Sequence, residues 1–396
     1  MARKKILWLC SWYPGKTEPF NGDFVQRHAR AAAMYNDIHV IHVTGDASGQ
    51  ITHTGKETSA FPGLTEHIVY YKRSPSFPGK LRSHYRWWKL TRQAIREYIK
   101  EKGRPDLVHV HIPVKSGLAG LWMKSKYGIP YVLTEHWGIY NDVLEDNYAS
   151  RSITFKKYTK KVFDKAAVFT SVSNYLAEGV NKWVTKKDYT IVPNVADTRL
   201  FFYRQKPVSA FRFIHVSNMV PLKNAEGILR AFSLLLREKR EALLVMVGDR
   251  SPFLHKLASD LGIPAANLLF CGEIPYEQVA TEMQGSDCLV LFSDIENSPC
   301  VIAEALCCGL PVIATATGGI PELVDDSNGV LIEPRDEKML AAAMGKMMDQ
   351  YGTYKKAEIA EQAMARFSYP VVGKMMDNIY QHPNQKRAPG SYPFNF

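Results

Sequence analysis

Cysteine is scarce in this 396-residue chain, and long apolar segments are missing from it. Most of the six cysteines stand in apolar runs and none forms a Cys-x-x-Cys pair, which disfavours a zinc site or a disulfide framework and indicates a reducing compartment. No stretch approaches the roughly 18 apolar residues of a membrane-spanning helix. The start, MARKKILWLCSWYPG, is broken by Pro14 and Gly15 and no small-residue cleavage site follows, so it is predicted to be a buried first strand and not a signal peptide.

Acidic residues are scarce in the first half of the chain. Residues 1–200 hold 31 Lys+Arg against 17 Asp+Glu, a net charge of +14, whereas residues 201–396 have a net charge of −3. This asymmetry suggests an anionic partner for the first half, such as a membrane surface, a nucleic acid or a phosphorylated lipid. A solvated basic surface without a partner is the alternative.

Short apolar runs alternate with helical patterns in two series, separated by a stretch without clear period over residues 192–211. The length exceeds the about 250–300 residues at which a single core stops growing. Buried strands between helices favour parallel sheets, so the fold class predicted is α/β with two Rossmann-like, doubly wound domains over 1–195 and 196–365. Ligands of such sheets bind outside the carboxyl ends of the strands, and we expect a site at a cleft that the domains face. The expected helices are 22–35, 80–101, 116–127, 150–165, 174–183, 224–238, 252–261, 276–285, 299–308, 320–325 and 336–350.

Two glutamates stand out in DIENSPCVIAEALCCGLPVIATATGGIPELV. Ser298 is a favoured N-cap and Pro299 a favoured first helical residue, so a helix is predicted to start at about 299 and to offer backbone N–H groups to an anion. Glu296 then lies in the loop before this helix and Glu304 inside it. A glutamate in so apolar a run is costly unless it is paired, either with a ligand or with a core lysine or arginine.

Two further loops have the character of anion sites. Gly318 and Gly319 stand between a strand and a helix start, where backbone donors bind anions. Lys223 lies after the strand FIHVS, before a helix that Asn224 is predicted to cap, and a lysine there can reach a phosphate. An ordinary exposed loop lysine is the alternative at this position.

Two features of the first half allow two interpretations each. His136 follows the strand YVLTE, either as a functional group or as a structural histidine, with Glu135 beside it as a competing candidate. Residues 79–103 form a basic amphipathic helix with Trp87 and Trp88. It either lies on an anionic membrane or covers the first domain with its tryptophans in the core.

Together these motifs resemble the retaining glycosyltransferases of family 4, which have the GT-B fold. The specific feature is the E-x7-E block from Glu296 to Glu304 followed by EALCCGLPVIATATGGIPELV. The resemblance extends over nearly the whole chain, through NGDFVQRHARA, VLTEHWG, SVSNYL, IVPNVAD, SNMVPLKN, VMVGD, FCGEI and FSYPVVGKMMDNIY. It is also consistent with a C-terminal helix at about 366–381 that packs back on the first domain.

The resemblance implies roles for individual residues. Glu304 matches the glutamate that binds the ribose, Glu296 the one near the donor hexose, and Lys223 a basic residue on the diphosphate. His136 matches a histidine close to the reacting sugar. The other implied positions are Asn218, Ile274, Ser298, Cys300, Val301, Gly318 and Gly319 on the donor side, and Asn21 and Gly22 in the loop for the acceptor or phosphate.

Two departures from the family pattern concern the donor. Asn218 stands where the family usually has an arginine, so Lys223 and the helix starts carry more of the diphosphate charge. The family's EGFGxxxxE is ENSPCVIAE here, and Pro299 has no N–H to offer to the donor.

We therefore expect a glycosyltransferase that moves a hexose from a UDP- or GDP-sugar to an acceptor hydroxyl with retention, in surface polysaccharide or lipid-linked saccharide synthesis. No Asp-x-Asp occurs in a convincing loop, and neither a metal nor another cofactor is expected. The expected location is cytoplasmic, either free or peripheral at the inner face of the membrane, and nucleic acid is not expected as a partner. The alternatives are a non-catalytic two-lobed sugar-binding protein, another GT-B enzyme such as a nucleotide-sugar epimerase, and a nucleic-acid-binding protein.

Overall fold

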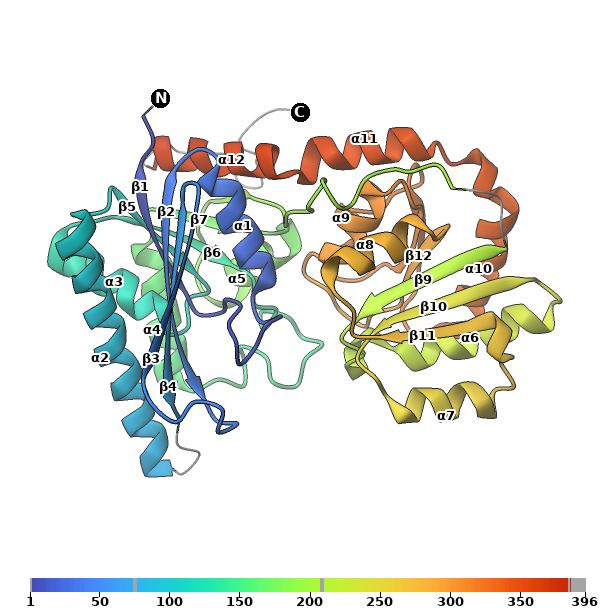
Figure 1. Ribbon diagram of the computed structural model, residues 1–396, viewed down its shortest axis with the longest axis horizontal. Helices are drawn as coiled ribbons and strands as arrows, with labels where there is room; N and C mark the ends of the chain where they lie inside the picture. The colour runs from blue at the N-terminus through green and yellow to red at the C-terminus, as the bar shows by residue number, and fades with distance from the viewer. Residues whose placement is uncertain (1, 74–76, 207–209, 384, 386–396) are drawn as a thin grey trace. The chain divides into compact units, whose positions relative to one another are not determined.

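The computed structural model describes residues 2–73, 77–206, 210–383 and 385 (Figure 1). The chain divides into two compact units. The first consists of the residues up to Val195 and those from Tyr369 onward, and the second of Ala196–Ser368.

The first unit is built on an eight-stranded sheet with the order β3-β4-β2-β1-β5-β6-β7-β8. All neighbouring strands are parallel except β3 and β4, which are antiparallel. The edge strand β3 was missed in the sequence because GKETSAF is polar and exposed along most of its length. The strands are β1 Lys5–Cys10, β2 Asp37–Asp46, β3 Gly55–Phe61, β4 Leu64–Lys72, β5 Leu107–His111, β6 Tyr131–Glu135, β7 Val168–Ser171 and β8 Tyr189–Ile191.

Helices cover both faces of this sheet, which explains why its strands are apolar on both sides. Leu7 and Leu9 of β1 pack in one core cluster, whereas Ile6 and Trp8, which point the other way, pack in a second. The first cluster includes residues of α2 Phe77–Lys102, α3 Ser116–Tyr127, α4 Ile153–Lys165 and α5 Asn174–Trp183, and the second includes residues of α1 Asp23–Ala33 and α12 Tyr369–Gln381.

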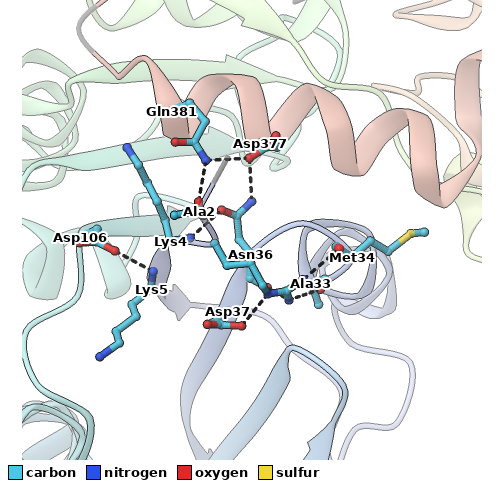
Figure 2. A network of polar contacts seen from close by, with 11 residues as sticks. Ala2, Lys4, Lys5, Ala33, Met34, Asn36, Asp37, Asp106, Asp377 and Gln381 are labelled. Carbon is cyan, nitrogen blue, oxygen red and sulfur yellow. Dashed lines mark hydrogen bonds and ion pairs between the residues drawn. The ribbon is translucent and has the colours of Figure 1, made fainter.

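The C-terminal helix α12 packs against α1 and is tied to the start of the chain by polar contacts (Figure 2). The Asn36 amide donates to Asp377 Oδ1 at 3.3 Å, and its oxygen accepts the Lys4 N–H at 3.2 Å. Lys4 Nζ donates to the carbonyl of Tyr380 at 2.8 Å, and Gln381 Nε2 donates to Asp377 Oδ1 at 3.0 Å. The last helix is thus an integral part of the first unit.

The second unit has a fully parallel six-stranded sheet with the order β11-β10-β9-β12-β13-β14. Its strands are β9 Phe211–Ser217, β10 Ala242–Gly248, β11 Leu268–Gly272, β12 Cys288–Leu291, β13 Val312–Thr315 and β14 Gly329–Ile332. Its helices are α6 Ala225–Arg237, α7 Pro252–Asp260, α8 Tyr276–Gln284, α9 Cys300–Cys307, α10 Glu337–Gln350 and α11 Lys356–Phe367, with single turns at η1 Pro221–Lys223, η2 Ala265–Asn267, η3 Ile320–Glu322 and η4 Tyr351–Thr353. The prediction of two α/β units with parallel sheets is confirmed.

The tryptophans of α2 belong to the protein interior. Trp87 is 3% exposed within the first core cluster, and Trp88 packs against the same cluster. The tryptophans thus lie as expected for a helix that covers the first domain, and contact of this helix with a membrane stays a prediction. Within the ranges the structure describes, no helix has the length and apolar character needed to cross a membrane.

Candidate active site

Three loops of the second unit meet at the carboxyl edge of its sheet, after the neighbouring strands β9, β12 and β13. The Asp294 N–H donates to the carbonyl of Leu222 at 2.8 Å, which joins the first two loops. The Thr317 hydroxyl donates to the Asp294 carbonyl at 2.9 Å, and the Gly319 N–H donates to the Glu296 carbonyl at 2.9 Å. Hydrogen bonds to backbone carbonyls thus hold the predicted lysine, E-x7-E and glycine segments as one assembly.

Lys223 and Glu296 form an ion pair at this edge. Lys223 Nζ lies 2.5 Å from Glu296 Oε1, which also accepts the Ser293 hydroxyl at 2.8 Å. The side chains are only 24% and 11% exposed, so solvent screens this pair less than a surface pair. The carboxylate holds the ammonium in one place, at the position where the sequence predicts a phosphate contact.

The glycine loop requires glycine at its first position. Gly318 has a φ of 58°, a conformation that residues with a side chain rarely adopt. A Cβ atom there would lie 1.9 Å from the carbonyl oxygen of Glu296. The backbone of the glycine loop therefore lies directly against the backbone of Glu296.

Helix α9 begins one residue later than predicted. Its first residue is Cys300 and Pro299 occupies the N-cap position, so the prediction of Ser298 as N-cap is wrong. Ser298 is buried in the preceding loop, while Cys300 and Val301 are half-buried in the first turn. These residues lie at the predicted helix start, but proline has no side-chain oxygen with which to cap it.

Glu304 is 3% exposed inside α9, and the structure shows a partner for it. The Tyr276 hydroxyl, from the first residue of α8, donates to Glu304 Oε1 at 2.6 Å. The Tyr276 ring packs on buried Phe201, with the ring centroids 4.9 Å apart. A tyrosine on a neighbouring helix, which no spacing within α9 indicates, orients this carboxylate.

The ends of β9, β10 and β11 complete this face of the second unit. Asn218 is exposed directly after β9, and Ile274 is half-buried two residues after β11. His215 of β9 is buried and forms hydrogen bonds with Ser217 Oγ at 2.8 Å and with the Val290 carbonyl at 2.9 Å. Burial lowers the pKa of His215 to about 4. A small cavity of about 160 Å³ is lined by Met219, Met246, Gly248, Asp249, Arg250, His255, Phe270 and Gly272.

In the first unit, the structure brings His136 together with His111. Nδ1 of His111 lies 3.2 Å from Nε2 of His136, and the Trp8 ring stacks on His111 at a centroid distance of 4.1 Å. Burial holds the pKa of both histidines well below the usual value, so both imidazoles are neutral at pH 7. His136 is buried, with 8% of its surface exposed.

Glu135 stabilises the loop that carries His136. Its Oε1 accepts the backbone N–H groups of His136 and Trp137, both at 2.9 Å, and its Oε2 accepts the Tyr140 hydroxyl at 2.6 Å. Burial raises the pKa of this carboxyl group to about 7. Its contacts are with its own loop and with the core, which makes it a positioning residue.

Gly22 lies at the start of α1 against the loop after β1. Its φ is 74°, and a Cβ atom would lie 2.6 Å from the carbonyl carbon of Trp12, so glycine is required here as well. Asn21 is half-buried beside it and donates to Glu18 Oε2 at 3.0 Å.

Several residues at the carboxyl edges of the two sheets were not predicted from the sequence. His111 was detectable, because HVHIP places a second histidine at a strand end. Tyr276 and Ser293 carry no local signal. Arg335 also carries none, although its guanidinium pairs with both oxygens of Asp294, at 3.0 and 2.8 Å, and so holds the loop before Glu296.

Metal binding has no visible basis in the ranges the structure describes, where no group of three or more His, Cys, Asp and Glu side chains is placed to hold an ion. Independence from metals stays a prediction.

Comparison with known proteins assigns both units. The model of Glycosyltransferase Family 4 matches residues 24–200, and that of Glycosyl transferases group 1 matches residues 198–365. The putative teichuronic acid biosynthesis glycosyltransferase TuaC of Bacillus subtilis is 25% identical over 399 residues, covering 95% of this chain and 98% of that protein. The N-acetyl-alpha-D-glucosaminyl L-malate synthase of Bacillus anthracis is 28% identical over 253 residues, 60% of this chain and 64% of that protein.

Solved structures share the fold at low identity. Sucrose-phosphate synthase from Thermosynechococcus elongatus matches with a TM-score of 0.75 and 18% identity, covering 96% of this chain and 99% of that one. HepE of Anabaena, in complex with UDP, matches with a TM-score of 0.72 and 19% identity, covering 95% and 99%. Since the two family models together span residues 24–365 and the fold is that of GT-B enzymes, the chain belongs to the family 4 glycosyltransferases.

Proposed function

We propose that this enzyme moves a hexose from a nucleotide diphosphate donor, a UDP- or GDP-sugar, to an acceptor hydroxyl with retention at the anomeric carbon. The observation that carries the proposal is the assembly of Lys223, Glu296 and the Gly318–Gly319 loop at one edge of the second unit. Three further facts support a nucleotide donor. HepE of Anabaena is solved with UDP and glucose, a Corynebacterium glutamicum relative is named as GDP-mannose-dependent, and Glu304 is held at the same edge.

The chemistry depends on stabilising the leaving group. As the glycosidic C–O bond breaks, negative charge develops on the diphosphate, and a preorganised cation lowers the free energy of that transition state. Lys223 has three N–H donors, so it can keep its bond to Glu296 and still donate to a phosphate. The Gly319 N–H already donates to the Glu296 carbonyl, so Lys223 is the main electrostatic contact and the glycine loop positions Glu296.

The two carboxylates then bind different parts of the donor. Glu304, oriented by Tyr276, accepts hydrogen bonds from the ribose hydroxyls, and Glu296 accepts them from the hexose. Ser298, Cys300 and Val301 at the start of α9 would face the donor phosphates and sugar, with Asn218 and Ile274 farther along the same edge. Retention requires that the acceptor approach the face that the diphosphate leaves, and a covalent intermediate is not a necessary part of that geometry.

The first unit would bind the acceptor, in polysaccharide or lipid-linked saccharide synthesis. Teichuronic acid biosynthesis in the name of the Bacillus subtilis relative supports the first of these. His136 and the loop of Asn21 and Gly22 lie at the carboxyl edge of the first sheet, where an acceptor is expected. No metal or other cofactor enters the proposed reaction.

Peripheral membrane contact, with the bulk of the chain in the cytoplasm, would involve the start of α2. Leu81 and Tyr85 are 66% and 71% exposed there, beside the exposed basic residues Arg82 and Arg86. Apolar and cationic side chains on one helix end favour an anionic lipid surface. Flotation with phosphatidylglycerol vesicles tests this: the wild type should float at low salt and Leu81→Ser/Tyr85→Ser should not, whereas salt-independent failure of the wild type to float contradicts it.

The proposed reaction is tested by a screen for transfer and hydrolysis with UDP-, GDP-, ADP- and TDP-sugars, in the presence and absence of EDTA. Turnover of one UDP- or GDP-sugar, unaffected by EDTA and lowered about 10²–10³-fold by Lys223→Ala, is the expected result. Nucleotide-sugar binding without turnover would favour the non-catalytic alternative. A lack of response to every nucleotide sugar would overturn the proposal.

A further inference from the structure

Aromatic rings gather at the carboxyl edge of the first sheet, around His136. Trp12 and Trp137 pack edge to face with ring centroids 6.1 Å apart, and Phe24 packs edge to face on Trp12 at 6.4 Å. The Phe24 ring also lies 5.0 Å from that of His136. Trp12, Phe24 and Trp137, here called the aromatic platform, are each only partly buried.

The topology explains why these rings meet. Trp12 follows β1 by two residues and Trp137 follows β6 by two residues, and β5 lies between these strands in the sheet. His111 ends β5, so the two indoles flank the strand end that carries the partner of His136. The platform therefore borders His136, which the family resemblance places close to the reacting sugar.

The Trp137 loop is held firmly enough to present its ring. Glu135 accepts the Trp137 N–H at 2.9 Å, and the Trp137 ring packs on Phe155 at a centroid distance of 6.3 Å. Gly22 lies against the backbone of Trp12, and the Trp12 ring packs on Phe24 and Trp137. Rings that are fixed before a ligand arrives lose little conformational entropy on binding it.

The charge at the platform is balanced. The Arg151 guanidinium lies 5.1 Å from the centroid of Trp137, in the range of a cation–π contact. The same guanidinium pairs with Asp146 at 2.8 Å, so its charge is compensated. A compensated cation beside partly buried aromatic rings favours a neutral ligand with an apolar face over a phosphate or a carboxylate.

We infer that the aromatic platform binds a pyranose ring of a neutral saccharide acceptor. The axial C–H groups give one face of a pyranose apolar character, and that face stacks on an indole while its hydroxyls stay in water or reach polar neighbours. The inference rests on the proposed function and narrows it. It predicts a sugar as acceptor, in contrast to the small anions that the names of some relatives include, such as L-malate and inositol 3-phosphate.

Saturation-transfer NMR on the full chain tests the platform without requiring turnover. The probes are the methyl glycosides of glucose, mannose, galactose and N-acetylglucosamine, together with L-malate and inositol 3-phosphate. At least one methyl glycoside should give signal with the wild type. Trp137→Ala should reduce that signal at least tenfold, and Trp137→Phe should restore most of it.

Trp122→Ala is the matched control, because Trp122 is also a half-buried tryptophan but packs on Trp88 of α2. It should leave the signal unchanged, and circular dichroism should show that all variants are folded. Signal from the two anions alone, or an equal loss in Trp122→Ala and Trp137→Ala, would overturn the inference. Failure of the wild type to bind any donor nucleotide would instead overturn the proposed function. The glycoside signal would still show whether the aromatic platform binds a saccharide.

Discussion

Lys223 and Glu296 matter most at the scale of single residues, because each determines what the other can do. The family resemblance implies that the lysine binds the diphosphate and the glutamate the hexose, as if they acted independently. In the structure the two side chains form a partly buried ion pair, with Lys223 Nζ 2.5 Å from Glu296 Oε1. Removing either partner changes the position or the charge of the other, so the effects of the two substitutions should not be additive.

Lys223→Ala should lower the rate of sugar transfer or donor hydrolysis by about 10²–10³-fold, the usual cost of losing one preorganised electrostatic contact to the transition state. Steady-state kinetics with the donor found in the screen measure this. The exposed Lys239 in the same unit gives the control, and Lys239→Ala should retain full activity. If kcat stayed within threefold of wild type in Lys223→Ala, the lysine would have no role in leaving-group stabilisation.

Tyr276→Phe should weaken donor-nucleotide binding by about three- to tenfold, because it removes the hydroxyl that orients Glu304 and keeps the ring. The loss corresponds to roughly one hydrogen bond, about 1 kcal/mol. Titration with the nucleotide measures the change. Unaltered affinity would mean that the orientation of Glu304 does not limit binding.

At the scale of elements, the site depends on loops that glycine permits to touch. Gly318→Ala places a Cβ against the Glu296 carbonyl and strains a backbone with positive φ. It should lower both the melting temperature and the nucleotide affinity, the latter by tenfold or more. Gly352, with open space around its Cβ position, supplies the comparison, and Gly352→Ala should leave nucleotide binding unchanged. Equal melting temperatures and nucleotide affinities of the two variants would show that the Gly318 loop tolerates displacement.

The elements themselves were largely predictable, because their signals are local. Asn224 caps α6 as predicted, with its side-chain oxygen accepting the Gly227 N–H at 3.1 Å. Apolar runs locate the buried strands, whereas the polar edge strand β3 gives no such signal. The start of α9 was placed one residue early, because Ser298 and Pro299 both suit a helix start and their preferences do not determine which residue is the N-cap.

Contacts between elements were not predictable in the same way. The pairing of Lys223 with Glu296 depends on β9 and β12 being neighbours in the sheet, although residues of β10 and β11 separate them in the sequence. The contact of Tyr276 with Glu304 and that of His111 with His136 also cross between elements. Periodicity and spacing within one segment carry no information about such partners.

At the scale of the whole molecule, buried histidines make stability depend on pH. Burial lowers the pKa of His28, His42 and His215 to about 4, and holds the pKa of His111 and His136 well below the usual value. Below about pH 6.5 these groups take up protons in the unfolded chain while they stay neutral in the folded one. The unfolded state then binds more protons, so the free energy of unfolding falls as the pH falls.

The fall should be steep between pH 6.5 and pH 4.5, since each fully linked histidine contributes about 1.4 kcal/mol per pH unit. Glu135 acts in the opposite direction, because its pKa is raised to about 7 and it binds a proton first in the folded state. One carboxyl group offsets only one of the histidines. Urea unfolding at a series of pH values measures this, and a constant free energy of unfolding from pH 7.5 to pH 5 would contradict it.

The central claim is that the second unit holds a nucleotide sugar through Glu304 and Lys223. Isothermal titration of the full chain with UDP and with GDP tests it most directly. The account predicts saturable binding of one of them in the absence of divalent metal, with affinity reduced at least tenfold in Glu304→Ala. Undetectable binding of both nucleotides, or equal affinity in the wild type and Glu304→Ala, would contradict it.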